Sequence, residues 1–154
     1  MSRAIHLVLV CGAFVLIAVP AFRAGPLGWH WLPRLRFVFL FGTAVLVASL
    51  ALAVWARRHL GPYWSGTITV KEEHRLIRSG PYSFVRHPIY TGLVGGMVGT
   101  AIALDELRGV LSVLLLLAAY LRKIRIEEKW LVERFGQTYL DYRKKVKALI
   151  PFVI

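Results

Sequence analysis

The chain has 154 residues, 57% of them hydrophobic, a mean hydropathy of +0.60 and a formal net charge of +12. This composition is too apolar for an ordinary soluble domain and fits one integral membrane domain. The single cysteine excludes a disulfide framework, and no cluster of metal-ligand residues is visible in the sequence. The positive charge does not require a nucleic-acid partner, because basic loops beside anionic lipid headgroups explain it.

Two long apolar runs open the chain and predict the first two membrane spans. Residues 4–22 and 37–56 each supply about 20 nearly uncharged residues, enough to cross a hydrocarbon core of roughly 30 Å at 1.5 Å per residue. The first run is too long for a secretory signal and has no clean small-residue cleavage site, so we expect it to be retained.

The next two runs, residues 88–104 and 108–126, predict a helical hairpin. Residues 110–120 alone are too short to span a membrane, so this helix must continue past Tyr120 while Arg122 and Lys123 snorkel toward the headgroups. A re-entrant pair is the alternative. The expected fold class is therefore all-α integral membrane, with about four transmembrane helices in a single domain.

The distribution of basic residues orients these spans. Sixteen of the 20 Lys and Arg residues lie at the N-terminus, between spans two and three, or after Tyr120; the other four are Arg23, Arg34, Arg36 and Arg108. The positive-inside rule then predicts a multi-pass protein with both termini in the cytoplasm. Two polar blocks face that side: a loop over residues 57–87 and a C-terminal helical segment over residues 127–150. Alternating residues in the loop suggest a short hairpin or extended pieces.

The segment RSGPYSFVRHPIYTG, residues 78–92, marks the start of the third span. Pro88 is favoured in the first turn of a helix, so the helix should begin at about His87. Free N–H groups and the positive dipole end there suit an anionic group, which Arg86 and His87 would line with Tyr90 facing it. Alternatively, His87 merely caps the helix and Arg86 pairs with a lipid phosphate.

The glycines that follow predict close helix packing. GLVGGMVG places Gly92 with Gly96, and Gly95 with Gly99, at i, i+4 spacing, which lets another helix approach closely. The pattern is not G-x-G-x-x-G and no strand precedes it, so a Rossmann fold is unsupported. A bare backbone surface could also admit a flat cofactor ring.

The second polar block contains adjacent carboxylates, Glu127 and Glu128. A solvated helix face with a Lys123–Glu127 pair is the ordinary interpretation; alternatively the carboxylates receive an ammonium group or ribose hydroxyls. The helix should end at residues 135–136. Beyond it, one face of a final amphipathic helix carries Tyr139, Tyr142 and Val146 and should cover something at the membrane surface.

Two stretches, HRLIRSGPYSFVRHPIYTG and EEKWLVERFGQTYLDYRKKVKALIPF, together with the four spans, resemble the family of isoprenylcysteine carboxyl methyltransferases and their phospholipid-methylating and prokaryotic relatives. The resemblance runs from about Leu60 to the end. It implies an integral membrane methyltransferase that uses S-adenosylmethionine on the cytosolic side, releases S-adenosylhomocysteine and takes a lipophilic substrate laterally from the bilayer.

Carried over residue by residue, the resemblance makes His87, Tyr90 and Glu128 cofactor contacts, followed by Gly92 and Glu127. It places Arg86 near the reacting centre, suited to hold an acceptor carboxylate or phosphate, so Arg86 and Glu128 are the expected catalytic residues. The final helix and Pro151 would cover the cofactor. Where prenylcysteine-specific members end in Val-Pro-Thr-Gly-Leu-Pro, this chain has VKALIP, which weakens the inference that prenylcysteine is the acceptor.

The expected function is therefore an S-adenosylmethionine-dependent methyl transfer to a lipophilic acceptor such as an isoprenylcysteine carboxylate. Such a displacement needs no metal and no covalent intermediate, and aligning the reactants can lower the barrier by about 7 to 11 kcal/mol. An amine acceptor would need a base, for which His74, His87 or Glu128 could serve. The alternatives are methylation of phospholipid amines or small thiols, and a non-catalytic membrane protein that binds anionic lipid.

Overall fold

The computed structural model describes residues 2–61 and 76–151, with side chains from residue 4 onward. Within these ranges the fold is all-helical, as predicted, with no strand and two isolated backbone bridges, His30–Glu106 and Val85–Lys147. The α-helices are α1 (Ser2–Ala18), α2 (Arg36–Leu60), α3 (Pro88–Leu104), α4 (Leu107–Phe135) and α5 (Gln137–Lys145). Short 3-10 helices form η1 (Pro20–Arg23), η2 (Gly25–Gly28) and η4 (Gly80–Ser83).

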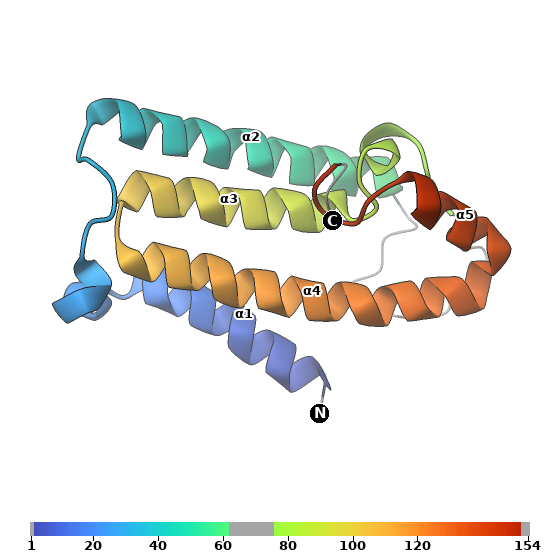
Figure 1. The fold of residues 1–154 in the computed structure, drawn as a ribbon, viewed down its shortest axis with the longest axis horizontal. Helices are drawn as coiled ribbons and strands as arrows, with labels where there is room; N and C mark the ends of the chain where they lie inside the picture. Colours follow the sequence, from blue (N-terminus) through green and yellow to red (C-terminus); the bar gives the residue numbers. More distant parts are fainter. Residues whose placement is uncertain (1, 62–75, 152–154) are drawn as a thin grey trace.

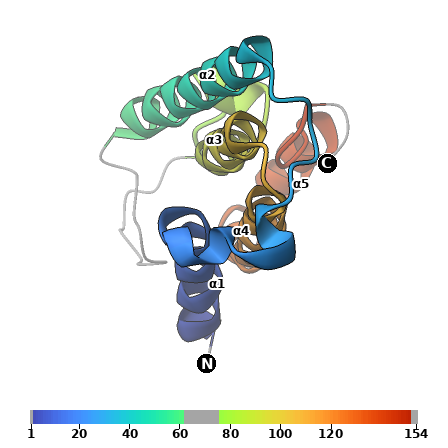
Figure 2. The same cartoon turned by 90° about the vertical axis from the view of Figure 1, so that its left-hand side faces the viewer.

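The four long helices lie side by side along the longest axis, and α5 sits at one end of them (Figure 1). Seen from the end, the helices follow the order α2, α3, α4, α1, each packed against the next (Figure 2). We call the end that carries α5, the end of α2 and the start of α3 the α5 end. The other, where residues 105–106 join α3 to α4, is the turn end. Both polar blocks of the sequence therefore meet at the α5 end.

Glycines allow α2 and α3 to pack closely, which confirms that prediction. A Cβ atom at Gly99 would lie 2.4 Å from the backbone nitrogen of Leu46, and one at Gly92 would lie 2.5 Å from the carbonyl oxygen of Ser49. No real Cβ atom tolerates such distances. Glycine is therefore required on this face of α3 for the two backbones to approach each other.

Helix boundaries follow local sequence signals, and two differ from the prediction. Because proline cannot continue a helix, α1 ends at Ala18 before Pro20 rather than running to residue 22. The fourth helix ends at Phe135, as predicted, but it is continuous from Leu107, so residues 127–135 belong to α4 rather than to a separate C-terminal segment. Gly136, with φ +52°, then permits the break before α5.

Of the other boundaries, the start of α3 agrees with the sequence, the end of α2 is a third difference, and some predicted features fall outside the described residues. Pro88 is the first residue of α3 and His87 precedes it as the N-cap, as predicted. The end of α2 takes residues 57–60 from the expected loop. The hairpin suggested around residues 67–70, and His74, lie outside the part of the chain that the structure describes.

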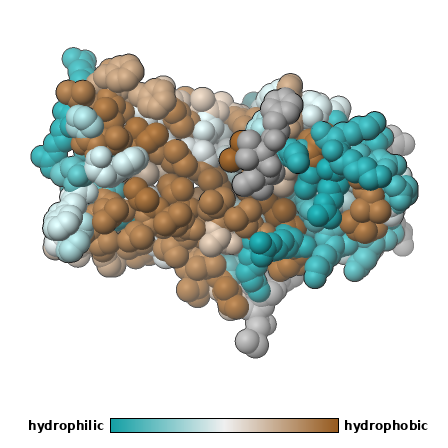
Figure 3. Space-filling model, viewed as in Figure 1, coloured by the Kyte–Doolittle hydropathy of each residue, from teal (hydrophilic) through white to brown (hydrophobic). Residues whose placement is uncertain are grey.

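On the face drawn in Figure 3, the middle of the helical body is broadly apolar, whereas the α5 end is polar. Large hydrophobic side chains with at least half of their surface exposed include Phe14, Phe37, Phe39, Phe41, Val47 and Trp55. In the described residues, α2 alone is both long and apolar enough to cross a membrane, and residues 4–18 and α3 form shorter apolar helices. Such an exposed apolar belt is typical of a surface that faces lipid.

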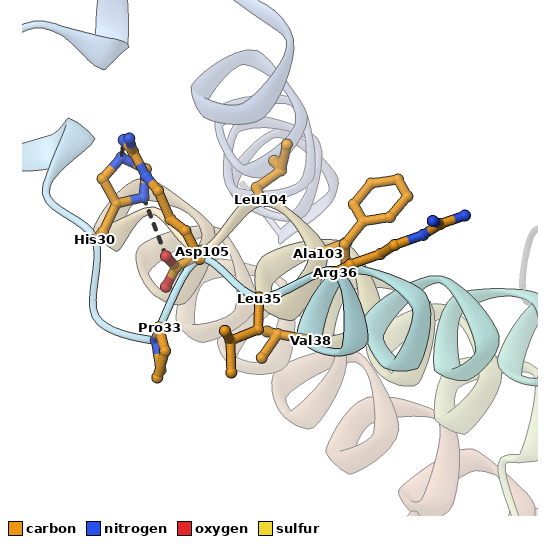
Figure 4. A pocket seen from close by; sticks show the side chains of 10 residues that line it. His30, Pro33, Leu35, Arg36, Val38, Ala103, Leu104 and Asp105 are labelled. Carbon is orange, nitrogen blue, oxygen red and sulfur yellow. Dashed lines mark hydrogen bonds and ion pairs between the residues drawn. The ribbon is translucent and has the colours of Figure 1, made fainter.

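A buried polar network locks the turn end. Asp105, with φ +55°, closes α3, and its carboxylate accepts hydrogen bonds from the backbone N–H groups of Trp31, at 3.2 Å, and Leu32. The His30 ring points toward the same carboxylate, 3.1 Å away, on one wall of a pocket between the 30–39 segment and the end of α3 (Figure 4). The carboxylate therefore ties the α1–α2 connection to the turn.

Arg108 completes this network from α4. Its side chain is 2% exposed; Nε donates to Glu106, and Nη1 donates to the carbonyl oxygens of Leu16 and Ile17 at 3.1 and 2.9 Å. The last carbonyls of α1 lack partners within their own helix, so the guanidinium satisfies them and fastens α1 to α4.

Candidate active site

The segment that follows α5 returns along the start of α3 and builds the site. The Arg86 N–H donates to the carbonyl of Lys147 at 2.8 Å, and the His87 N–H donates to that of Ala148 at 3.0 Å. The Thr91 hydroxyl adds a bond to the carbonyl of Leu149 at 2.7 Å. The described parts of the two polar blocks thus meet, and α4 forms the third wall of the site. The N–H group of His87, which was expected to be free at the start of α3, is already bonded within the chain.

Arg86 and Glu128 form a buried ion pair at the centre. Nε and Nη2 of the guanidinium lie 2.8 and 2.5 Å from Oε1 of Glu128, and the two side chains are only 8% and 10% exposed. Nη1 donates to the carbonyls of Val146 and Arg143. The sequence placed Arg86 beside a substrate or lipid anion; the structure gives it an internal partner on α4.

His87 and Tyr90 face both carboxylates of α4. The His87 ring lies 3.4 Å from Glu128 Oε1 through Nε2 and 3.7 Å from Glu127 Oε2 through Nδ1. Tyr90 donates its hydroxyl hydrogen bond to Glu127 at 2.7 Å, and the predicted contact of Lys123 with Glu127 forms at 3.8 Å. Although close to Glu128, the buried Nε2 of His87 has no hydrogen-bond partner within the described chain.

A row of stacked rings leads away from the carboxylates. The His87 and Tyr90 rings are nearly parallel with centroids 5.6 Å apart, and Tyr90 stacks on Tyr120 at 4.6 Å. The rings of His6, from α1, and Tyr120 meet edge to face, with centroids 5.7 Å apart. Sequence reasoning missed Tyr120 and His6. The sequence did contain a signal for both residues: His6 is an ionisable ring within the apolar run 4–22, and Tyr120 is a tyrosine at the end of the apolar run 110–120.

Electrostatics keep Glu128 ionised. Burial by itself favours the neutral acid, but the contacts with His87 and Arg86 outweigh it and lower the pKa of Glu128 to about 2. At neutral pH the carboxylate is therefore a fixed negative charge. A cationic group of a ligand would meet this charge and the aromatic faces beside it.

The remaining predicted residues take less central places. Gly92 lies against Ser49 and Ala53 of α2, which gives an independent reason for a glycine there, so its contact with a cofactor stays a prediction. Tyr139 and Tyr142 are buried beneath α5 as expected, and Tyr142 donates to the carbonyl of Tyr82 at 2.5 Å. Pro151 is exposed at the end of the described chain.

Comparison with known proteins places this geometry in a family. The profile of the isoprenylcysteine carboxyl methyltransferase (ICMT) family matches residues 40–133, which include α3, most of α4 and the residues Arg86, His87 and Glu128. The chain belongs to the isoprenylcysteine carboxyl methyltransferase family. The profile match ends before α5.

Individual relatives agree with this membership. The chain is 36% identical over 117 residues to the protein-S-isoprenylcysteine O-methyltransferase of Saccharomyces cerevisiae, covering 74% of this chain and 49% of that protein. It is 35% identical over 128 residues to that of Mus musculus, covering 81% and 45%. Among solved structures, the eukaryotic intramembrane Ras methyltransferase ICMT matches with a TM-score of 0.75 at 25% identity, over 95% of this chain and 52% of that one. The chain thus spans about half the length of these relatives.

Proposed function

We propose that this family member is an S-adenosylmethionine-dependent methyltransferase that acts at the membrane on a lipophilic acceptor. The observation that carries the proposal is the meeting of His87, from the start of α3, with the buried ionised carboxylate of Glu128 on α4, 3.4 Å away. The curated relatives are named as methyltransferases of isoprenylcysteine. The chain spans about half of their length.

The residues at the α5 end fit the cofactor chemically. S-adenosylmethionine has an ammonium group, a sulfonium cation and a flat base; when bound, it supplies an electrophilic methyl group. Glu128 offers a negative charge for the ammonium group, and the stacked faces of Tyr90 and Tyr120 suit a cation or a flat ring. His87 Nε2 is a buried polar atom that lacks a hydrogen-bond partner among the described residues, as expected at a ligand site.

The acceptor side of the proposal rests on Arg86. A carboxylate acceptor is already ionised at neutral pH and needs no general base, so holding it in line is enough. Arg86 lies beside Glu128 and is the buried cation of the site, which makes it the candidate to hold such a carboxylate. We therefore propose an isoprenylcysteine-type carboxylate as the acceptor.

The proposal includes an orientation in the membrane. With four spans and both termini on the cytoplasmic side, the apolar belt lies in the bilayer and the α5 end lies at its cytoplasmic surface (Figure 3). A lipophilic acceptor would then reach the site from the bilayer. Cysteines introduced singly at Ser2 and at Arg34, labelled from one side of sealed vesicles, test this: they should react from opposite sides.

Calorimetry of detergent-solubilised protein with S-adenosylhomocysteine tests the function directly. We expect the wild type to bind it, and His87→Ala to weaken this binding at least tenfold. His30→Ala, which removes the same side chain at the turn end, is the matched control and should keep the affinity of the wild type. Failure of the wild type to bind at high ligand concentration would refute the enzyme proposal.

An acceptor panel then identifies the substrate. Methyl transfer is measured to an N-acetylated S-prenylcysteine, to phosphatidylethanolamine and to a small thiol, with the same protein in the same lipid. The proposal expects transfer to the prenylcysteine carboxylate. If the protein binds the cofactor but methylates only the amine or the thiol, the proposed methyltransferase activity stands and the proposed carboxylate acceptor is rejected.

A further inference from the structure

Tyr139 carries a buried hydroxyl that the site described so far does not use. The residue lies in the first turn of α5 and is only 1% exposed. Its hydroxyl has no hydrogen-bond partner in the part of the chain that the structure describes. A phenol buried in this way costs stability, because it has lost its hydrogen bonds to water and gained none from the protein. A purely structural role would be filled better by phenylalanine.

The charged groups around Tyr139 are those of the site. Burial raises the pKa of the Tyr139 phenol first, and the negative charge of Glu128 raises it further, while Arg86 acts in the opposite direction. Both groups lie close enough to the hydroxyl to act on its proton directly, but neither meets the geometry of a hydrogen bond with it among the described residues. The guanidinium donates instead to Glu128 and to the carbonyls of Arg143 and Val146. The phenol therefore remains protonated and can donate.

Two buried polar atoms that make no hydrogen bond within the described residues thus lie around Glu128. One is the Tyr139 hydroxyl from α5, and the other is Nε2 of His87, 3.4 Å from the Glu128 carboxylate. A neighbour of the same type behaves differently, because the Tyr142 hydroxyl donates to the carbonyl of Tyr82 at 2.5 Å. The missing partner is therefore a property of the Tyr139 position and not of tyrosines in α5 generally.

We propose that Tyr139 is a further cofactor-binding residue, whose hydroxyl donates a hydrogen bond to the carboxylate at the amino-acid end of the cofactor. This inference rests on the proposed function. An amino acid presents an ammonium group and a carboxylate on one carbon, so an ammonium group paired with Glu128 brings its carboxylate within reach of neighbouring donors. The cation of Arg86 beside the same glutamate offsets the negative charge that the carboxylate adds.

The test is Tyr139→Phe, which removes the hydroxyl alone. Calorimetry should show that the affinity for S-adenosylhomocysteine falls about tenfold or more, the usual effect of losing a hydrogen bond to a charged group. The affinity for its decarboxylated analogue, S-adenosyl-3-thiopropylamine, should be the same in the wild type and in the variant. The melting temperature of the ligand-free protein should not fall, because the hydroxyl has no partner to lose.

Tyr142→Phe is the matched control for stability, and it should lower the melting temperature of the ligand-free protein by removing the bond to Tyr82. Three results would overturn the role of Tyr139: an affinity for S-adenosylhomocysteine within twofold of the wild type, an equal loss for the decarboxylated analogue, or a drop in melting temperature as large as that of Tyr142→Phe. If the wild type itself fails to bind S-adenosylhomocysteine, the proposed function fails instead.

Discussion

The two ends of the helical body both bury charged side chains, but they satisfy them differently. At the turn end, Asp105 and Arg108 have partners in the surrounding chain, including backbone groups of the α1–α2 connection and the end of α1. At the α5 end, Arg86 and Glu128 are paired, yet the buried Nε2 of His87 and the hydroxyl of Tyr139 have no hydrogen-bond partner among the described residues. A network that is complete by itself serves the fold, whereas one with unpaired buried atoms is suited to a ligand.

The largest effect that would test this comparison is expected from Glu128→Ala. Removing the carboxylate leaves the guanidinium of Arg86 buried without its counter-charge, which should cost about 4 kcal/mol of unfolding free energy. The same variant should lose the binding of S-adenosylhomocysteine. Denaturant titration in micelles and calorimetry measure the two losses.

The control for this variant is Glu133→Ala, which removes an exposed glutamate from the same helix and should change neither quantity. A Glu128→Ala protein that is as stable as the wild type would mean that the ion pair does not hold the α5 end together.

Arg108→Met should affect stability only. The variant loses the bonds to Glu106 and to the last carbonyls of α1, with an expected cost of about 3 kcal/mol. Its affinity for S-adenosylhomocysteine should stay within twofold of the wild type once the protein is folded. Arg36→Met, at an exposed position of the same end, should be neutral. A selective loss of affinity in Arg108→Met would break the division between the two ends.

Gly99→Ala should have an intermediate effect by forcing α2 and α3 apart. The new Cβ would lie 2.4 Å from the Leu46 backbone nitrogen, so the helices must shift, at a cost of about 2 kcal/mol. Gly96→Ala is the matched control, because its nearest neighbour is a flexible Leu46 side-chain carbon at 3.4 Å. Equal melting temperatures of the two variants would contradict the close packing.

The smallest expected effect is a loss of folding stability at acidic pH. The pKa of Glu128 is about 2 in the folded protein, below the ordinary value of 4.5, so its contribution to stability is complete above pH 4.5 and disappears as the pH falls toward 2. At pH 3.5 the loss should be about 1 kcal/mol. The melting temperature of the wild type should therefore fall more between pH 5 and 3 than that of Glu128→Gln, and parallel curves would refute this assignment.

Much of the architecture was predictable because its causes are local. Apolar runs marked the helices, Pro88 marked the first residue of α3, and glycine spacing marked the face that packs against α2. The end of α4 at residues 135–136 was also visible. These features depend on hydropathy and backbone preference within a few residues. The predicted end of α1 at residue 22 was too late, because the apolar run continues past Pro20 while the helix stops before it.

The site was predictable in part. Motifs named Arg86, His87, Tyr90 and Glu128, and the structure brings these four side chains together at the α5 end. Spacing could not show that Arg86 pairs with Glu128. Tyr120 and His6 were missed although each is a polar ring within or at the end of an apolar run, and Tyr139 was expected only on the covering face of the final helix.

The sequence by itself determined the membrane class, the positions of the helices and the two polar blocks, since each depends on the composition of one continuous segment. Only the tertiary structure decided that the chain beyond α5 returns to α3, and that Glu128 is paired while the hydroxyl of Tyr139 is not. The physical reason is that a buried polar group is satisfied or left unpaired by neighbours from other helices. Those neighbours are chosen by packing, which no single segment encodes.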